Sequence, residues 1–341
     1  MAPVPYRGRV PSLPPAIAEI RLAVRTALAE LPDGSAVVVA LSGGADSLAL
    51  AAAAVFESRP RGIRVLSATI DHGLQDGSGD VAARAAVQAE GIGVHDALLA
   101  RADVDVSSGS GIEAAARDAR YAALRGIART EEAAAVLLGH TLDDQAETVL
   151  LGLARGSGAA SLQGMAPVRT GDDGVRWIRP LLGVRRETTR AFCTASGLDP
   201  WDDPHNADTR FARVRVRERV LPVLEDELGP GIAEALARTA EQLREDAEAF
   251  DDMIHETIED IVEHAEAGIS VSVLALAANP AALRNRIIRL VVDSEFGVSL
   301  TRMQTIEVAR LVTDWSGQGP IDLPGCSAVR RGGRLVFVAR A

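Results

Sequence analysis

Residues 36–47 read Ala-Val-Val-Val-Ala-Leu-Ser-Gly-Gly-Ala-Asp-Ser and decide the fold class of this chain. The first six residues are a continuous apolar run, which is typical of a parallel strand buried on both faces. The glycine-serine turn ends the strand, and the following residues 48–56 (LALAAAAVF) are predicted to be helical. We therefore predict a buried strand, a tight loop and a helix in direct succession.

The same alternation of strands and helices extends on both sides of this stretch. Further strands are predicted at 63–70, 94–99 and 134–138, and helices at 17–31, 81–90, 112–129 and 143–154. Such an alternation indicates βαβ units, and hence an α/β fold whose parallel sheet carries helices on both faces. We assign residues 1–15 to a proline-rich tail and 16–224 to one catalytic domain.

The pattern changes after residue 224. Residues 224–267 are predicted to be helical and are strongly acidic, with further helices expected directly after Pro280 and at 300–313. The C-terminus carries Gly-Pro, Pro-Gly and Gly-Gly pairs around two short apolar runs, which is typical of a β-hairpin. We expect a smaller helical domain over 225–316, followed by a hairpin over 317–341.

Composition limits the function classes. The 341 residues carry 36 basic and 47 acidic side chains, a net charge of −11, and every basic residue is arginine. Without lysine, neither a Schiff base nor a Walker-type phosphate loop is possible. A chain this acidic needs a local basic patch to bind nucleic acid. The two cysteines, Cys193 and Cys326, are too few for a structural zinc site. No apolar stretch suits a membrane span or a signal peptide, so we expect a cytoplasmic protein that does not bind membranes.

The loop Ser42-Gly43-Gly44-Ala45-Asp46-Ser47 has the properties of a phosphate site. Glycines let the backbone approach a phosphate, and the start of a helix supplies N–H donors and a positive dipole end. The two serine hydroxyls add donors, and the Asp46 carboxylate could hold Mg²⁺. The alternative is a plain capped turn, which explains the glycines but not both serines and the aspartate.

A second polar group lies where the strand at 134–138 passes into the next helix. It consists of His140, Asp143, Asp144 and Glu147, whose spacing lets several of them face one cleft. Carboxylates there could bind Mg²⁺, hold a cationic amino acid or accept a proton from an amine. Capping of the helix by acidic residues is the structural alternative and explains one or two of them.

Arginines supply the local basic patch. Five of them, Arg210, Arg213, Arg215, Arg217 and Arg219, lie in ten residues, and Arg117 and Arg120 lie on the predicted helix 112–129. Arginine binds phosphate through two parallel hydrogen bonds. A charged surface helix is the alternative for the first group, and a solvated pair of Arg117 with Glu113 for the second.

The loop at 42–47 resembles the pyrophosphate loop (PP-loop) of the ATP pyrophosphatases, and further blocks are similar to the tRNA(Ile)-lysidine synthetases. These blocks are 71–74 (DHGL), 111–121, 138–150, 155–158, 164–165, 179–182, 203–206 (DPHN) and 213–217 (RVRVR). The sequence departs from the family pattern at His205, where serine is usual, and at Val214, where asparagine is frequent.

The resemblance implies an ATP-dependent carbon–nitrogen ligase that uses Mg²⁺. ATP would adenylate the C2 oxygen of the wobble cytidine in tRNA(Ile) with a CAU anticodon, and the ε-amine of L-lysine would then displace AMP. The implied ATP-binding residues are Ser42, Gly43, Gly44, Ala45, Asp46, Ser47, Ile70, His72 and His140, with Asp46 as the Mg²⁺ ligand. The implied substrate-binding residues are Arg117, Arg120, Asp143, Asp144, Glu147, Arg213, Arg215 and Arg217, and the catalytic ones are Asp46, Asp144, Glu147 and Arg217.

Two other functions remain open from the sequence. A tRNA thiolase or an amide-forming synthetase could share the loop, although thiolation normally needs paired cysteines and amide formation from glutamine needs a nucleophilic cysteine. A nucleotide-binding regulatory module without chemistry would bind ATP but release neither AMP nor pyrophosphate. The sequence also leaves open which of the arginines 213, 215 and 217 contacts phosphate, how tRNA(Ile) is told from its methionine counterpart, and the oligomeric state.

Overall fold

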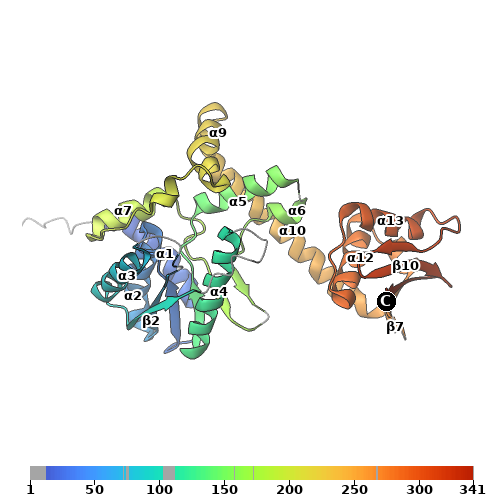
Figure 1. Ribbon diagram of the computed structural model, residues 1–341, viewed down its shortest axis with the longest axis horizontal. Coiled ribbons are helices and arrows are strands. Elements are labelled where there is room, and N and C mark those ends of the chain that lie inside the picture. The colour runs from blue at the N-terminus through green and yellow to red at the C-terminus, as the bar shows by residue number, and fades with distance from the viewer. Residues whose placement is uncertain are drawn as a thin grey trace, which may run out of the picture. The chain divides into compact units, whose positions relative to one another are not determined.

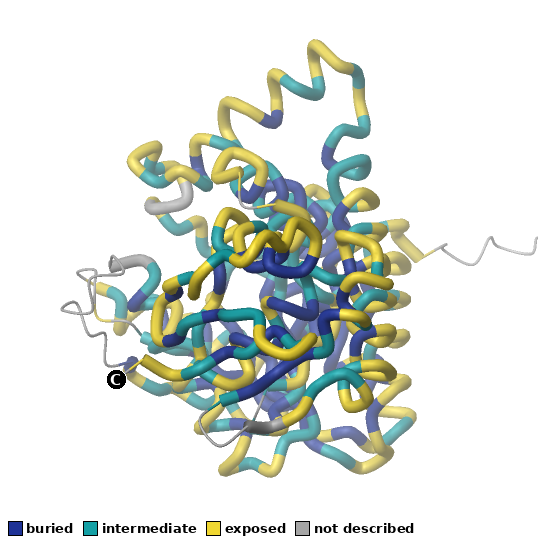
Figure 2. The backbone as a smooth tube through the Cα atoms, turned by 90° about the vertical axis from the view of Figure 1, so that its right-hand side faces the viewer, coloured by how far each residue is buried: buried dark blue, intermediate teal, exposed yellow. Residues whose placement is uncertain are grey.

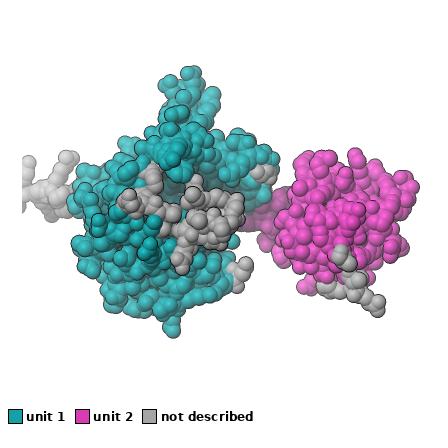
Figure 3. Space-filling model, in the orientation of Figure 1, with its two compact units in different colours: residues 1–244 teal, residues 245–341 magenta. Residues whose placement is uncertain are grey.

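The computed structural model describes residues 13–71, 73, 77–102, 112–156, 158–171, 173–265 and 268–340. The chain divides into two compact units, residues 1–244 and 245–341 (Figure 3). His72, one of the expected ATP-binding residues, lies outside the described residues.

The first unit contains a six-stranded, mainly parallel sheet (Figure 1). Its strands, in spatial order, are β3 (Asp96–Arg101), β2 (Arg64–Asp71), β1 (Ala36–Ala40), β4 (Ala133–Leu137), β6 (Arg176–Ile178) and β5 (Val168–Thr170). Only the β5–β6 pair is antiparallel among the strands of this sheet. The four strands predicted from the sequence are confirmed, and β1, which is formed by the apolar run at 36–41, lies in the middle of the sheet.

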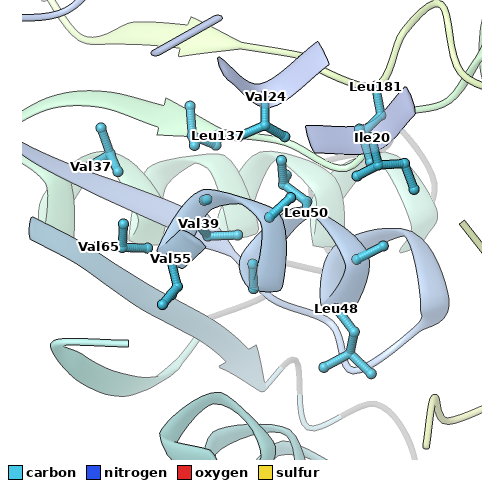
Figure 4. Close-up of a cluster of buried hydrophobic side chains, with 14 of the residues drawn as sticks. Ile20, Val24, Val37, Val39, Leu48, Leu50, Val55, Val65, Leu137 and Leu181 are labelled. Atoms are coloured by element: carbon cyan, nitrogen blue, oxygen red, sulfur yellow. The ribbon is translucent and has the colours of Figure 1, made fainter. Parts of the chain in front are cut away.

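Alternation along β1 explains why this strand is apolar at every position. Val37 and Val39 pack into a core on one face of the sheet, while Val38 packs into a core on the other (Figure 4 shows the first). All five residues of β1 are buried. The buried and exposed segments along the backbone can be followed in Figure 2.

Helices cover both faces of the sheet, as the sequence predicted. The first core includes residues from α1 (Pro15–Ala29), α2 (Ala45–Ser58), α3 (Ser78–Ile92) and α7 (Arg186–Ser196). The second includes residues from α4 (Ile112–Thr130). The short helix α6 (Ala159–Leu162) packs against α5 (Leu142–Arg155), where a side chain on Gly152 would collide with the Ser161 carbonyl oxygen.

The second unit contains a five-stranded antiparallel sheet with helices. Its strands, in spatial order, are β7 (Val262–Ala265), β8 (Gly268–Ser272), β11 (Arg334–Ala339), β10 (Cys326–Arg331) and β9 (Ile321–Leu323). The helices are α11 (Val273–Ala278), α12 (Ala281–Phe296) and α13 (Arg302–Thr313). The predicted hairpin is confirmed as β10–β11, and the helices expected after Pro280 and near residue 300 are present.

Most of the region 224–267 is helical, as predicted. The helical part is divided into α9 (Leu221–Glu227) and α10 (Ile232–Ile261), and the prediction is wrong at the end of the region, where the chain enters β7 at Val262. Gly229 and Gly231 between the helices both have positive φ values, 96° and 99°, which a continuing α-helix does not allow. Beyond the C-terminal end of α10, Ile269 and Val271 of β8 point into the core of the second unit. A spacing of two residues between core side chains is typical of a strand.

Within the described part of the chain, no helix is both long enough and apolar enough to cross a bilayer.

Candidate active site

A cleft of about 1600 Å³ opens where β1 and β4 end, the edge of a parallel sheet at which ligands usually bind. Its walls come from the loop at 42–47, α4, the start of α5, α7, the segment 201–203 and residues 211–218. The cleft thus brings together the phosphate-type loop, His140 and Asp144 of the second polar group, and part of the arginine group that the sequence singled out.

The loop between β1 and α2 is held by its own serines. The Ser42 backbone N–H donates to Ser47 Oγ at 3.2 Å, the two hydroxyl oxygens lie 3.1 Å apart, and Ser47 Oγ donates to the Gly44 carbonyl at 2.9 Å. Gly43 has a φ of +82°, which favours glycine. The α2 N-terminus has no side-chain cap, so its N–H donors face the cleft without a competing hydroxyl.

Gly139, just after β4, lies against the start of α2. A Cβ on Gly139 would come within 3.2 Å of the Asp46 carbonyl carbon and of the Ser47 nitrogen. This close approach sets the distance between the phosphate-type loop and the polar group that begins at His140.

Asp46 lies in the first turn of α2 and lines the cleft. It accepts a hydrogen bond from the Thr189 hydroxyl, and Arg186 Nε lies 3.8 Å from its Oδ2. Burial raises the pKa of the Asp46 carboxyl, against the opposing effects of Thr189 and Arg186.

Asp144 serves two purposes, one with each oxygen. Its Oδ2 accepts hydrogen bonds from the Thr141 N–H (2.8 Å) and hydroxyl (2.9 Å), which completes the capping box of α5. Its Oδ1 lies 2.8 Å from Arg186 Nη2 and 3.6 Å from Arg217 Nη2. Burial raises the Asp144 pKa, but Arg186 and the Thr141 hydrogen bonds outweigh it, so the pKa lies below its usual value. The capping and functional interpretations of this residue therefore coexist.

Glu147 is the most enclosed charged group of the site, with no side-chain exposure. Arg217 Nε lies 2.7 Å from its Oε1, Arg186 Nη1 lies 3.3 Å from the same oxygen, and Arg213 Nη1 lies 3.9 Å from Oε2. A buried carboxylate needs such partners to remain in the folded chain. Three arginines from separate elements therefore meet at one acid.

Asp143 points to a different side of α5. Its Oδ2 accepts the Arg186 backbone N–H at 2.7 Å, and its Oδ1 lies 3.6 Å from Arg185 Nη1. It lines a smaller pocket of about 190 Å³, together with Glu147 and Glu225. Asp143 thus faces this pocket and the start of α7, while Asp144 lines the main cleft.

The arginines of the 210–219 region separate by orientation. Arg213 lies on α8 (Ala212–Arg215) and Arg217 on the π-helix Val216–Val220, and both line the cleft. Arg215 donates instead to the carbonyl oxygens of Thr209 (2.8 Å) and Arg210 (2.7 Å) and is not a lining residue. A π-helix inside helical structure is common at functional sites.

A further part of the cleft lining, from α4 and from the loop between β4 and α5, carries Arg117, Arg120 and His140. Burial lowers the pKa of Arg120, with Tyr121 opposing and Arg117 adding to the effect. Burial also lowers the His140 pKa to about 3, against the attraction of Asp144, so this imidazole is neutral at physiological pH. Its Nδ1 has no hydrogen-bond partner among the described residues. This part of the lining therefore presents cationic and neutral polar groups to the cleft.

Most of the expected site residues meet here, but not all. Ile70 packs beside the apolar core around β1 and β2, and neither it nor Gly43 lines the cleft. Arg186 and Thr189 of α7 contact the site acids and were missed by the sequence analysis. The block Arg179-Pro-Leu-Leu182, which resembles the family, ends four residues before Arg186. It was the sequence feature that could have directed attention to this helix.

Known proteins are similar to most of this chain. A PP-loop domain family model matches residues 18–224, and a model described as the TilS substrate binding domain matches residues 272–336. A tRNA(Ile)-lysidine synthase from Leifsonia xyli subsp. xyli is 58% identical over 308 residues, covering 90% of this chain and 91% of the relative. Another from Thermobifida fusca is 47% identical, covering 96% and 98%.

The chain belongs to the tRNA(Ile)-lysidine synthase family. Membership confirms the resemblance seen in the motifs, and it supports an ATP-dependent ligase over a thiolase or an amide-forming synthetase. A U34-tRNA thiolase, NcsA from Methanococcus maripaludis, has a similar structure, with a TM-score of 0.58 over 67% of this chain and 80% of that one. At 21% identity this likeness shows the fold alone.

The contact at Gly139 generates a prediction. Gly139→Ala should raise the dissociation constant for ATP about 10-fold, because the backbone of Asp46 and Ser47 must shift to admit the methyl group. Isothermal titration calorimetry with ATP measures this effect. The matched control is Gly183→Ala, where an added Cβ meets no atom within 4 Å. Equal ATP affinity in the two variants would contradict the assigned position of the loop.

Proposed function

We propose that this chain catalyses the ATP-dependent formation of lysidine at the wobble cytidine of tRNA(Ile) with a CAU anticodon. The single observation that carries the proposal is that Asp46 and Asp144 line one cleft beside the PP-loop, with the buried Glu147 joined to them through Arg186. The family of the chain and its PP-loop domain support the same conclusion. The proposal includes a cytoplasmic location, where tRNA, ATP and free lysine are available together.

In the first step, the C2 oxygen of the cytidine attacks the α-phosphorus of ATP, and the bond to pyrophosphate breaks. The departing pyrophosphate would be bound by backbone N–H groups at the α2 N-terminus and by the hydroxyls of Ser42 and Ser47. Arg117 and Arg120 of α4, which line the cleft, would offset negative charge on the nucleotide. The neutral His140 offers a hydrogen bond without adding charge.

Asp46 would hold Mg²⁺. This ion usually takes one or two protein carboxylates and completes its shell with phosphates and water. Asp46 fits that requirement, because its carboxylate lines the cleft in the first turn of α2; the described residues contain no cluster of three or more metal-ligating side chains. When bound, the ion offsets the charge of the leaving pyrophosphate.

In the second step, the lysine ε-amine forms a bond to C2, the C2–O bond breaks and AMP leaves. The amine nitrogen must lose a proton, and Asp144 and Glu147 are the acceptors at hand. Arg217, 2.7 Å from Glu147 and lining the cleft, is placed to steady the α-phosphate as AMP departs. Arg215 is turned away, so we assign this role to Arg217.

The target cytidine must leave the anticodon stack to enter the cleft, as single-stranded RNA loops allow. We propose that the second unit, which contains the matched substrate binding domain, contacts the rest of the tRNA. Its arginines at 284, 286, 289, 330, 331 and 334 are the candidates for phosphate contacts.

Nucleoside analysis tests the reaction. Purified protein with ATP, Mg²⁺, labelled lysine and a tRNA(Ile) transcript should yield lysidine, with AMP and pyrophosphate released in equal amounts. Mass spectrometry of the digested RNA detects the product. The control transcript carries uridine in place of the wobble cytidine and should take up no lysine. ATP binding without AMP or pyrophosphate release would favour the regulatory module, and transfer to another acceptor would favour a different enzyme of the superfamily.

Removal of the acids tests their roles. Asp144→Asn and Glu147→Gln should each lower the rate of lysine incorporation about 100-fold or more. Glu147→Gln should also lower the free energy of unfolding by about 3–5 kcal/mol, because it leaves buried arginines without their shared partner. Glu30→Gln, an exposed acid paired with Arg176, is the matched control and should change neither quantity. Near-normal incorporation by a folded Asp144→Asn protein would refute its role.

A further inference from the structure

Arg186 is the residue of this site that reaches all three carboxylates assigned to catalysis. Its Nη2 lies 2.8 Å from Asp144 Oδ1, its Nη1 lies 3.3 Å from Glu147 Oε1, and its Nε lies 3.8 Å from Asp46 Oδ2. These acids come from two separate helices, α2 and α5, while Arg186 begins a third, α7. A single guanidinium therefore ties the loop side of the cleft to its acidic side.

The position of Arg186 is fixed at its backbone as well as at its side chain. Its N–H donates to Asp143 at 2.7 Å, and its carbonyl oxygen accepts the Thr189 hydroxyl at 2.7 Å, the same hydroxyl that contacts Asp46. The side chain is only 18% exposed. Ion pairs in such partly dry surroundings are screened little by solvent, so their geometry matters.

We propose that Arg186 is a positioning residue for the reaction, which holds Asp144 and Glu147 in register with Asp46 so that the attacking amine meets an aligned pair of acids. This inference rests on the proposed function and adds a residue to it. Arg186 acts through the carboxylates. Without it, neighbouring like charges on Asp46, Asp144 and Glu147 repel one another and move apart.

The shape of the group explains why arginine occupies this position. A guanidinium presents several N–H donors in one plane and can serve three acceptors at once, whereas an ammonium is a compact charge on a flexible stem. Lysine at this position would keep the positive charge but could not hold all three carboxylates in the same alignment. Glutamine would lose both the positive charge and the planar set of N–H donors.

The other arginines of the site do not duplicate this connection. Arg217 reaches Asp144 and Glu147, and Arg213 reaches Glu147, but neither forms an ion pair with Asp46 among the described contacts. Loss of Arg186 therefore leaves Glu147 paired with Arg213 and Arg217. Asp144 loses its shortest ion pair, and Asp46 loses the one ion pair that it forms with a described residue.

The test compares steady-state lysine incorporation in wild type, Arg186→Gln, Arg186→Lys and Arg186→Ala. Arg186→Gln should lower kcat about 100-fold, as expected when reacting groups are slightly misplaced. It should raise KM for lysine about 10-fold, equivalent to one lost charged hydrogen bond, and raise KM for ATP less, because Asp46 keeps its hydrogen bond from Thr189. Arg186→Lys should recover part of kcat. Added guanidinium chloride at low millimolar concentration should partly restore the Arg186→Ala enzyme.

The matched control is Arg176→Gln, which removes an arginine from the surface ion pair with Glu30. This variant should have the wild-type kcat and the wild-type KM values for lysine and ATP. A purely structural role predicts a lower melting temperature with unchanged KM values in the remaining folded enzyme, and no recovery with guanidinium. That result, or Arg186→Gln kinetics equal to wild type, overturns the inference while the proposed function stands. A wild-type enzyme that forms no lysidine overturns both.

Discussion

The enclosed carboxylate of Glu147 is the constraint on which the site depends. A buried charge is tolerated only when partners surround it, and here the partners are arginines from three places in the chain: the start of α7, helix α8 and the π-helix that follows. Because all of them must reach one helix turn of α5, the segments that carry them are drawn to the end of the sheet. Neutralisation of Glu147 thereby positions the residues of α7, α8 and the π-helix that line the cleft.

The charge pattern of the cleft follows from this arrangement. Acids and arginines compensate one another on the α5 and α7 side, which suits a zwitterionic amino acid with an additional amine. Arg117, Arg120 and a neutral His140 line the cleft together with the loop at 42–47 and offer hydrogen-bond donors that suit a nucleotide. The proposed function places two successive reactions with different charge demands in this one cavity.

The sequence predicted the architecture well where local pattern and burial agree. The apolar run at β1 is buried on both faces, so its composition alone predicted a buried parallel strand. The break between α9 and α10 at Gly229 and Gly231 was not predicted, since periodicity does not report backbone conformation. The strands β5, β6, β7, β8 and β9 were missed. All but β8 have only three or four residues, which carry too little alternation to be recognised.

At the site, motif spacing identified Asp144 and Glu147, but not what holds them. Arg186 lies some 40 residues away in the sequence and meets these acids only in the folded chain. The orientation of the arginine side chains could not be predicted from the sequence either. Arg213, Arg215 and Arg217 look equivalent there, yet of these three only Arg213 and Arg217 line the cleft. Local pattern gives residue types and spacing, whereas tertiary contacts decide which side chains converge.

In the proposed reaction, the cleft lined by the PP-loop, Asp144 and the arginines binds the nucleotide and the amino acid together. A crystal structure with a non-hydrolysable ATP analogue and L-lysine tests it most directly. The account predicts the terminal phosphates on the backbone amides of residues 42–47 and the lysine side-chain nitrogen within hydrogen-bond distance of Asp144 or Glu147. A triphosphate bound elsewhere, or lysine bound away from both acids, would contradict it.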